Sequence, residues 1–233
     1  MVFLCPTTVY LWKFNENDAH RKIRCAFFKR KKKMKIYDIS QEVFTCQVYP
    51  DDPAPQKSVL MDMKKGELYN LTAFSMCAHN GTHIDAPAHF IKDGKTVDTI
   101  GLEAFVGKAY VVDCQGVIDK EAALRIIEKA KAKSKEGAKR ILMKGNAEIS
   151  LDAAIVFAAS DVLLLGCESQ TFGPETAPMA VHLALLSKGV VLLEGLRLNN
   201  VPEGEYFLAA APLNLSGAEG SPCRAVLIEG IEK

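Results

Sequence analysis

The chain has 233 residues and a net charge of +1, with 48% hydrophobic and 24% charged residues. This length allows one α/β domain with a sizeable core, and the composition excludes a disordered, collagen-like or coiled-coil protein. The charge is unevenly distributed, because residues 1–33 carry nine Lys and Arg against two acidic residues, whereas the other 200 residues carry 20 basic and 26 acidic side chains.

The basic leader, residues 1–33, lacks the pattern of a membrane span or a secretory signal. Its apolar stretch Val2–Phe14 contains Pro6 and Lys13, and it is shorter than the ~18–20 residues that cross a bilayer. Its positive charges follow the apolar stretch, whereas those of a signal peptide precede it. We predict that Met34 is the functional start, that residues 1–33 are disordered or not native, and that residues 34–233 form the domain. A nucleic-acid or membrane-surface arm is the alternative.

Strand and helix patterns follow the leader. Residues 35–40 are predicted to form a strand, and residues 49–53 (Tyr-Pro-Asp-Asp-Pro) a loop, because two prolines and two aspartates cannot continue a sheet. Residues 58–63 and 67–76 alternate apolar and polar positions, as half-buried antiparallel strands do. An apolar strand is predicted at 109–114. A helix with apolar positions at helical spacing begins after Asp119, a good N-cap, and ends near Lys133.

The second half of the chain alternates strands with helices. We predict strands at 140–144, 162–166, 190–194 and 224–228, and helices at 151–159 and 178–187, the latter ended by Gly189. This alternation favours partly parallel pairing. The sequence therefore predicts one α/β domain with a mixed sheet.

The seven cysteines include no CxxC pair and are odd in number, so no disulfide framework is indicated. We expect them to be small core residues. With no signal peptide, the reducing cytoplasm is the predicted compartment.

The most informative segment is His79-Asn-Gly-Thr-His83-Ile-Asp85-Ala-Pro-Ala-His89-Phe90, which holds three of the five histidines of the chain. Imidazole and carboxylate groups together suit Zn²⁺, Mn²⁺ or Fe²⁺. Gly81 permits a tight backbone approach and Pro87 limits any helix, so the ligands are expected on a turn and its flanks. The alternative is a set of polar loop histidines satisfied by hydrogen bonds.

Two familiar hydrolytic motifs are excluded. The zincin motif needs a glutamate directly after its first histidine, and this position is Asn80. There is also no Gly-x-Ser-x-Gly elbow, and no cysteine is spaced to lie beside a histidine.

Two residues far downstream are candidates for the same site. His182 falls in the predicted helix 178–187, and Glu194 ends a very apolar strand. A carboxylate at the carboxyl end of a buried strand is costly unless it is paired or coordinated, and α/β sheets place their sites at that end. The alternative for Glu194 is a salt bridge to Arg197 or a surface position.

The segment 79–90, His182, Glu194 and the run Gly-Ser-Pro-Cys-Arg at 220–224 together resemble the cyclase-like metal hydrolases, which include bacterial kynurenine formamidase and isatin hydrolase. The resemblance covers about residues 34–230. Loop 49–53 looks like the family's substrate-side loop, with Asp51 where a glycine is usual. The segment 166–170 departs from the family's usual Gly-Ile-Asp-x-x-Ser.

The resemblance implies a swivelling β/β/α domain that assembles as a homodimer or homotetramer. In the formamidase branch, two zinc ions are held by residues that match the set His79, His83, Asp85, His182 and Glu194. Asp85 matches the bridging ligand, and His89 matches a proton-transfer residue. The isatin hydrolase branch implies a single manganese, so one or two Zn²⁺ are expected, with Mn²⁺ as the alternative.

The chemistry of such a site predicts a metal-dependent amidohydrolase. A bound divalent cation lowers the pKa of its water from ~15.7 to roughly 7, and the hydroxide would attack a carbonyl. His89 would take the proton and return it to the leaving atom. The expected substrate is a formamide such as N-formylkynurenine. The alternatives are another cyclic amide or lactone, as in isatin, or a non-catalytic metal-binding protein of the same fold, which the altered segment 166–170 supports. Neither a nucleic-acid nor a membrane partner is expected.

Overall fold

The computed structural model describes residues 4–5, 8–9, 28–29, 33–174 and 177–230, which fall into two compact units. The first unit comprises residues 1–35 and 230–233. Its described strands β1 (Leu4–Cys5), β2 (Thr8–Val9) and β3 (Phe28–Lys29) pair antiparallel. The other residues of the predicted leader, except residue 33, lie outside the described residues.

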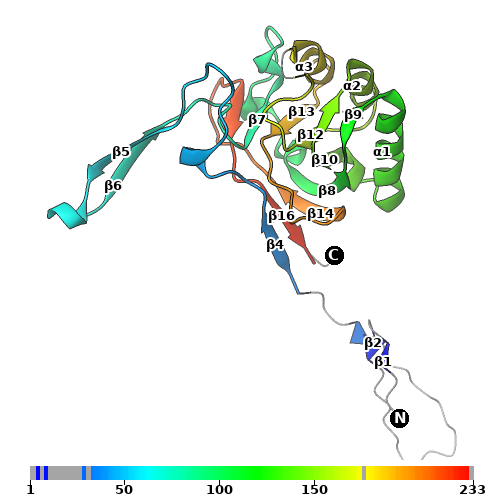
Figure 1. Cartoon of the computed structure of the whole chain (residues 1–233), viewed down its shortest axis with the longest axis horizontal. Coiled ribbons are helices and arrows are strands. Elements are labelled where there is room, and N and C mark those ends of the chain that lie inside the picture. The colour runs from blue at the N-terminus through cyan, green and yellow to red at the C-terminus, as the bar shows by residue number, and fades with distance from the viewer. Residues whose placement is uncertain (1–3, 6–7, 10–27, 30–32, 175–176, 231–233) are drawn as a thin grey trace, which may run out of the picture. The chain divides into compact units, whose positions relative to one another are not determined.

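The second unit, residues 36–229, is built on a nine-stranded sheet in the order β15-β7-β13-β12-β10-β8-β14-β16-β4 (Figure 1). The four strands β13, β12, β10 and β8 are parallel, and β7 and β14 flank them antiparallel. The strand bounds are β4 (Lys35–Asp38), β7 (His83–Asp85), β8 (Val106–Asp113), β10 (Arg140–Lys144), β12 (Leu164–Cys167), β13 (Val191–Glu194), β14 (Gly204–Ala209), β15 (Gly220–Pro222) and β16 (Val226–Glu229).

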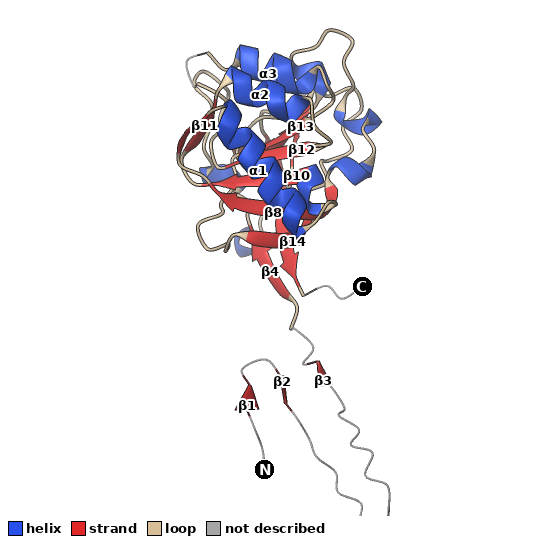
Figure 2. Ribbon diagram, turned by 90° about the vertical axis from the view of Figure 1, so that its right-hand side faces the viewer, coloured by secondary structure: helices blue, strands red, loops and turns tan. Residues whose placement is uncertain are grey.

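Three helices cover one face of this sheet, as Figure 2 shows: α1 (Lys120–Lys133), α2 (Leu151–Ala158) and α3 (Met179–Leu186). Asp119 caps α1 by accepting a 2.8 Å hydrogen bond from the amide of Ala122. Ser150 caps α2 in the same way through Ala153. Each cap satisfies a backbone donor that the first helical turn leaves unpaired.

Short elements complete the second unit. A parallel pair joins β9 (Gly116–Ile118) to β11 (Ala147–Ile149). The 3-10 helices are Val43–Thr45, Met63–Lys65, Pro87–His89, Val97–Thr99, Leu102–Ala104 and Gly137–Lys139.

The central strands β12 and β13 are buried on both faces of the sheet, so they contribute to two apolar cores. Leu165 and Leu192 pack with the helices, whereas their neighbours Leu164 and Leu193 pack into the core on the opposite face. This alternation follows from the two-residue side-chain period of a strand. Strands buried on both faces read as continuous apolar runs, as parallel strands of α/β proteins do.

The predicted fold class, an α/β swivelling β/β/α domain with a mixed sheet, is confirmed. The strand at 140–144 and the helix that follows the N-cap Asp119 and ends at Lys133 are observed as predicted, and the other predicted strands and helices shift at their ends. The prediction for residues 58–76 was partly wrong. These residues form an antiparallel hairpin of β5 (Gln56–Met61) and β6 (Leu71–Ser75), but it projects from the body and is exposed rather than half-buried (Figure 1).

Candidate metal centre

The first part of the site lies on the turn before β7 and on β7 itself. His79 lies in the turn, His83 and Asp85 are the two ends of the strand, and His89 ends the 3-10 helix that follows. Gly81 has a φ of 66°, and a Cβ added there would lie 2.9 Å from Cβ of Cys46. Only glycine fits this close, left-handed backbone, so the turn requires it.

Sheet pairing brings the distant ligands to this turn. β13 pairs antiparallel with β7, and the register places Glu194 opposite His83. Helix α3 supplies His182. The structure therefore places the predicted ligands His79, His83, Asp85, His182 and Glu194 in one cluster, at the carboxyl end of β13.

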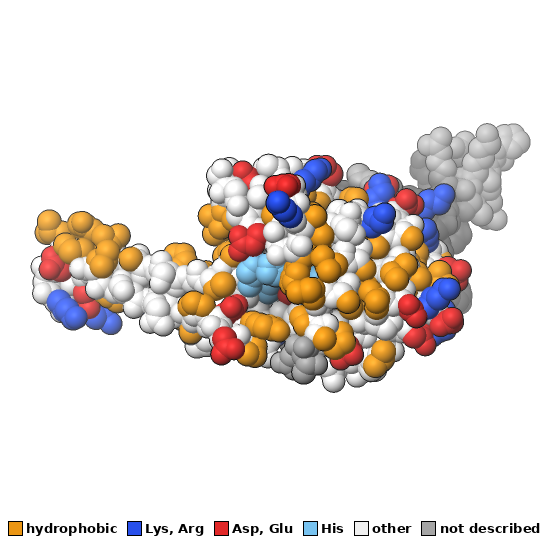
Figure 3. Space-filling model, turned by 90° about the horizontal axis from the view of Figure 1, so that it is seen from above, with side chains coloured by type: hydrophobic (Ala, Val, Ile, Leu, Met, Phe, Trp, Pro, Cys, Tyr) orange, Lys and Arg blue, Asp and Glu red, His pale blue; other side chains and the backbone are white. Residues whose placement is uncertain are grey.

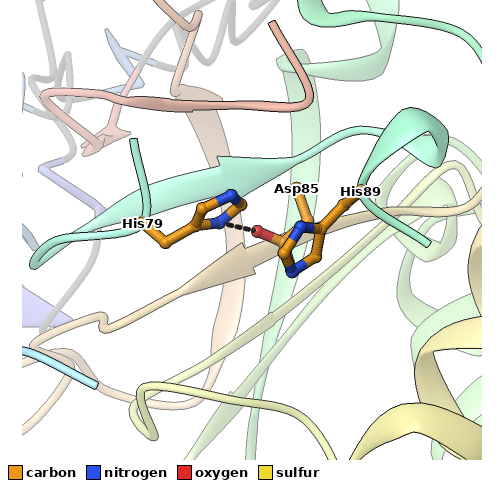
Figure 4. A group of neighbouring side chains, drawn as sticks. All are labelled: His79, Asp85 and His89. Atoms are coloured by element: carbon orange, nitrogen blue, oxygen red, sulfur yellow. Dashed lines mark hydrogen bonds and ion pairs between the residues drawn. The ribbon is translucent and has the colours of Figure 1, made fainter. Parts of the chain in front are cut away.

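Asp85 is the centre of the cluster. Its Oδ1 lies 2.8 Å from Nδ1 of His79 (Figure 4). The same oxygen lies 3.4 Å from Nε2 of His83, and Oδ2 lies 3.6 Å from Nε2 of His182. The Asp85 side chain is 1% exposed. One carboxylate thus contacts three imidazoles from two parts of the chain.

Glu194 is a second buried carboxylate between two of these histidines. Its Oε2 lies 3.3 Å from Nε2 of His83, and its Oε1 lies 3.3 Å from Nε2 of His182. Oε1 also accepts a 2.9 Å hydrogen bond from the amide of Phe172. Glu194 therefore pairs with His83 and His182, and not with Arg197 as in the alternative. The guanidinium of Arg197 donates to the carbonyl of Leu196.

The two carboxylates control the charge of the histidines. Burial lowers the pKa of His83, but hydrogen bonds to Asp85 and Glu194 outweigh burial and raise that pKa to about 10. The same balance raises the pKa of His182 to about 10. Burial raises the pKa of Asp85, but the three histidines hold it well below its usual range. Without a cation, protons on the imidazoles balance the buried negative charge.

The outward-facing ring nitrogens of the three histidines also have partners. Nδ1 of His83 lies 3.0 Å from the carbonyl oxygen of Gly81, and Nδ1 of His182 lies 2.9 Å from that of Pro178. Nε2 of His79 lies 3.3 Å from Oε1 of Glu219. Metal-binding histidines usually donate their second N–H to a carbonyl or carboxylate in this way.

The donor set fits a divalent metal. Ligand atoms of His83, Asp85 and Glu194 lie within 4.8 Å of one another, and so do those of His79, Asp85 and His89. Asp85 belongs to both groups, so it could bridge two ions. Buried imidazole and carboxylate donors in this number suit Zn²⁺ or Mn²⁺.

His89 lies beside this cluster on the imidazole of His79. The two rings stack with centroids 4.1 Å apart and planes 29° apart. Phe90 packs against the His89 ring at 4.4 Å and against that of His182 at 4.9 Å. Burial lowers the pKa of His89, so its imidazole is neutral near pH 7 and can accept a proton.

The cluster lines a hollow of about 260 Å³, and Figure 3 shows the histidines as a pale blue group on this face. The size suits a small molecule. The other residues of its wall are Tyr49, Asp52, Phe90, Gln170, Thr171 and Pro178. Asp51 in the neighbouring loop has a φ of 71°, the left-handed conformation that explains why a glycine is usual there.

Three polar residues near the site were not found from the sequence. Gln170 and Glu219 contact the ligand turn and His79. Glu168 accepts hydrogen bonds from the amides of Gly145 and Leu198, so in the altered segment 166–170 this side chain ties two loops together. Their roles depend on contacts across the fold, and no local pattern marks them.

The free cysteines are Cys46, Cys77, Cys114, Cys167 and Cys223. Cys167, near the site, is fully buried, and burial raises the pKa of its thiol well above the usual range. It is a core residue and a poor nucleophile.

The fold and the His/Asp/Glu cluster define a metal-dependent hydrolase. The Cyclase family model matches residues 37–173. Kynurenine formamidase from Salinibacter ruber is 34% identical over 210 residues, covering 83% of this chain and 97% of its own. The corresponding protein from Erythrobacter litoralis is 30% identical and covers 85% and 96%. The chain therefore belongs to the Cyclase family, which confirms the resemblance.

Solved structures agree with this assignment. A potential metal-dependent hydrolase with cyclase activity superimposes with a TM-score of 0.70 at 28% identity, covering 86% of this chain and all of that one. Isatin hydrolase A from Labrenzia aggregata superimposes with a TM-score of 0.71 over 85% of this chain and 94% of its own. Its 21% identity supports the shared fold alone.

Proposed function

We propose that the protein is an arylformamidase-like enzyme that hydrolyses the amide bond of a formamide such as N-formylkynurenine. The observation that carries the proposal is the pair of buried carboxylates, Asp85 and Glu194, whose oxygens lie within 3.6 Å of ring nitrogens of His79, His83 and His182. The kynurenine formamidases from Salinibacter ruber and Erythrobacter litoralis, 34% and 30% identical over most of this chain, support this substrate class.

The residues proposed to hold the metal are His79, His83, Asp85, His182 and Glu194. A divalent cation bound to them would lower the pKa of its water and polarise the substrate carbonyl. Zn²⁺ is the proposed ion, at one or two per chain, and Mn²⁺ is the alternative that the same donors accept.

His89 is proposed to transfer the proton between the attacking water and the leaving amine nitrogen. Its neutral imidazole lines the hollow and stacks on the ligand His79. A base at this place can accept a proton at neutral pH, as general base catalysis requires. The aromatic rings of Tyr49 and Phe90, in the same wall, would contact an aromatic substrate.

A hydrolysis screen tests the substrate class. Metal-free protein is reconstituted with Zn²⁺ or Mn²⁺ and incubated with N-formylkynurenine, N-formylaniline and isatin. We expect formate release from the two formamides. Ring opening of isatin, without formate release from either formamide, would favour the cyclic-amide alternative. If metal-loaded protein turned over none of the three substrates, a non-catalytic metal-binding protein would be favoured.

The proposed assembly is a homodimer that uses the hairpin β5–β6. A two-stranded hairpin alone is only marginally stable in water, yet this one projects with large apolar side chains exposed. They are Val59, Leu60, Met63, Leu68, Tyr69, Leu71 and Phe74. A second copy would offer the same apolar surface across a two-fold axis. The molar mass from light scattering tests this assembly. We expect the mass of a dimer for the wild type and that of a monomer for the double variant Leu68→Asp/Phe74→Asp.

The cytoplasm is the proposed compartment, with a small molecule and no nucleic acid as the partner. Among the described helices, none is both long and apolar enough to cross a membrane.

A further inference from the structure

We infer that Gln170 and Gln41 are positioning residues that hold the ligand turn of the metal centre against the end of β13. This inference rests on the proposed metal site and adds to it two residues outside the ligand set.

Gln170, in the segment after β12, reaches across to the backbone of the ligand turn. Its Nε2 donates to the carbonyl oxygen of His79 at 3.0 Å and to that of Gly81 at 2.8 Å. The Gly81 oxygen in turn lies 3.0 Å from Nδ1 of His83. One amide group therefore fixes the backbone of one ligand and the carbonyl that orients another.

Gln41 connects this contact to β13. Its Nε2 donates to the carbonyl oxygen of Gly195 at 2.8 Å and lies 3.3 Å from Oε1 of Gln170. Its Oε1 accepts a 2.8 Å hydrogen bond from the amide of Gln47, whose own carbonyl oxygen accepts from the amide of Gly81. Gly195 directly follows the ligand Glu194, so the two glutamines bridge both halves of the site.

The backbone leaves no space for a looser arrangement at this point. Gly195 has a φ of 68°, and a Cβ added there would lie 2.2 Å from the carbonyl oxygen of Gly81. Thr82, also buried, donates to the Gly195 oxygen at 2.7 Å and accepts from the amide of Gln41 at 2.9 Å. The turn therefore packs directly against Gly195 and is held there by hydrogen bonds from the side-chain amides of Gln41 and Gln170.

Sheet pairing alone would not fix the whole ligand set. The β7–β13 register holds His83 and Asp85 opposite β13, but His79 lies in the turn outside β7. Asp85 and Glu219 contact its imidazole, whereas its backbone carbonyl is held by Gln170, which in turn contacts Gln41. Loss of such outer contacts typically weakens metal binding by about 10- to 100-fold.

The test measures metal affinity and stability separately. Metal-free Gln170→Ala and Gln41→Ala are titrated with Zn²⁺ against a chromophoric chelator, and their thermal unfolding is followed without metal. We expect each to bind Zn²⁺ about 10- to 100-fold more weakly, with unfolding temperatures close to wild type. Because the two side chains contact each other, the double variant should lose less than the product of the single losses.

The control is Gln115→Ala, at an exposed glutamine in the link between β8 and β9, which should bind Zn²⁺ as the wild type does. Gln41→Glu preserves the size of the side chain but replaces the Nε2 donor with an acceptor, so it should weaken Zn²⁺ binding as Gln41→Ala does. It takes the place of the alanine variant if that variant does not fold. Wild-type affinity in the Gln170 and Gln41 variants would overturn the inference. Failure of the wild type to release formate would instead count against the proposed substrate and leave this titration valid.

Discussion

The imidazole of His89 stacks on that of His79, with the ring centroids 4.1 Å apart. Nδ1 of the same His79 ring lies 2.8 Å from Oδ1 of Asp85. His89 is therefore close enough to the site to transfer a proton, and close enough to be a ligand. His89→Ala distinguishes the two. We expect wild-type metal content by elemental analysis and a kcat lower by ~10²–10⁴-fold. Loss of metal in the same variant would make His89 a ligand.

Asp85 should matter more for metal binding than Glu194, because its carboxylate contacts three of the proposed ligand imidazoles and that of Glu194 contacts two. We expect Asp85→Asn to bind no Zn²⁺ at micromolar concentration, and Glu194→Gln to retain partial occupancy. Equilibrium dialysis measures both, with Asp152→Asn on the exposed face of α2 as the control. Equal occupancy in the two variants would argue against a shared ligand.

Glu219 is expected to orient His79, because Oε1 lies 3.3 Å from the outward ring nitrogen. Gly220 supports the same ring, since a Cβ added there would lie 2.5 Å from it. The Glu219 side chain is 47% exposed, so we expect Glu219→Ala to weaken Zn²⁺ binding by about tenfold, at the low end of such effects. Chelator competition measures the change. An unchanged affinity would show that the contact has no role in the metal site.

The stability of the metal-free protein should depend on pH. Hydrogen bonds raise the pKa of His83 and His182 to about 10 in the metal-free protein, above about 6.5 in the unfolded chain. The stability that these protonated groups contribute is complete below about pH 6.5 and is lost as pH rises toward about 10. Denaturant unfolding of metal-free protein should therefore show a falling free energy over this range.

A cation must displace the same protons. The apparent Zn²⁺ affinity should rise about tenfold per pH unit for each proton released. Calorimetry in buffers of different ionisation enthalpy counts the protons. An affinity that is flat between about pH 6 and 8 would contradict protonated histidines in the metal-free site.

Removal of residues 1–33 tests the leader. We expect a protein of residues 34–233 to match the full chain in metal content, turnover and solubility, because every proposed site residue lies downstream. A loss of nucleic-acid or vesicle binding on deletion would instead favour the basic-arm alternative.

Local patterns were enough to predict the parallel strands and helices, because apolar runs and caps such as Asp119 are properties of neighbouring residues. They were not enough for β7, β14 and β15, since β7 and β15 are short and all three are defined by their partners in the sheet. The hairpin shows the same limit, because alternation predicts a pleated strand but not what covers it.

The site was predictable where its chemistry is concentrated. The segment from His79 to His89 carries most of it in eleven residues, and the predicted helix 178–187 and the apolar strand ending at Glu194 marked His182 and Glu194 as further candidates. Gln41 and Gln170 act through backbone carbonyls 154 and 91 residues away, and Glu219 acts through an imidazole 140 residues away. Contacts between residues so far apart in the chain produce no recognisable spacing pattern in the sequence.

The most direct test of the central claim is the metal content of purified protein after reconstitution with Zn²⁺ or Mn²⁺ and removal of free ion. The proposed centre predicts at least one tightly bound ion per chain, lost together with formate release in Asp85→Asn. Fewer than one ion per two chains in the reconstituted wild type would contradict a metal centre at these residues.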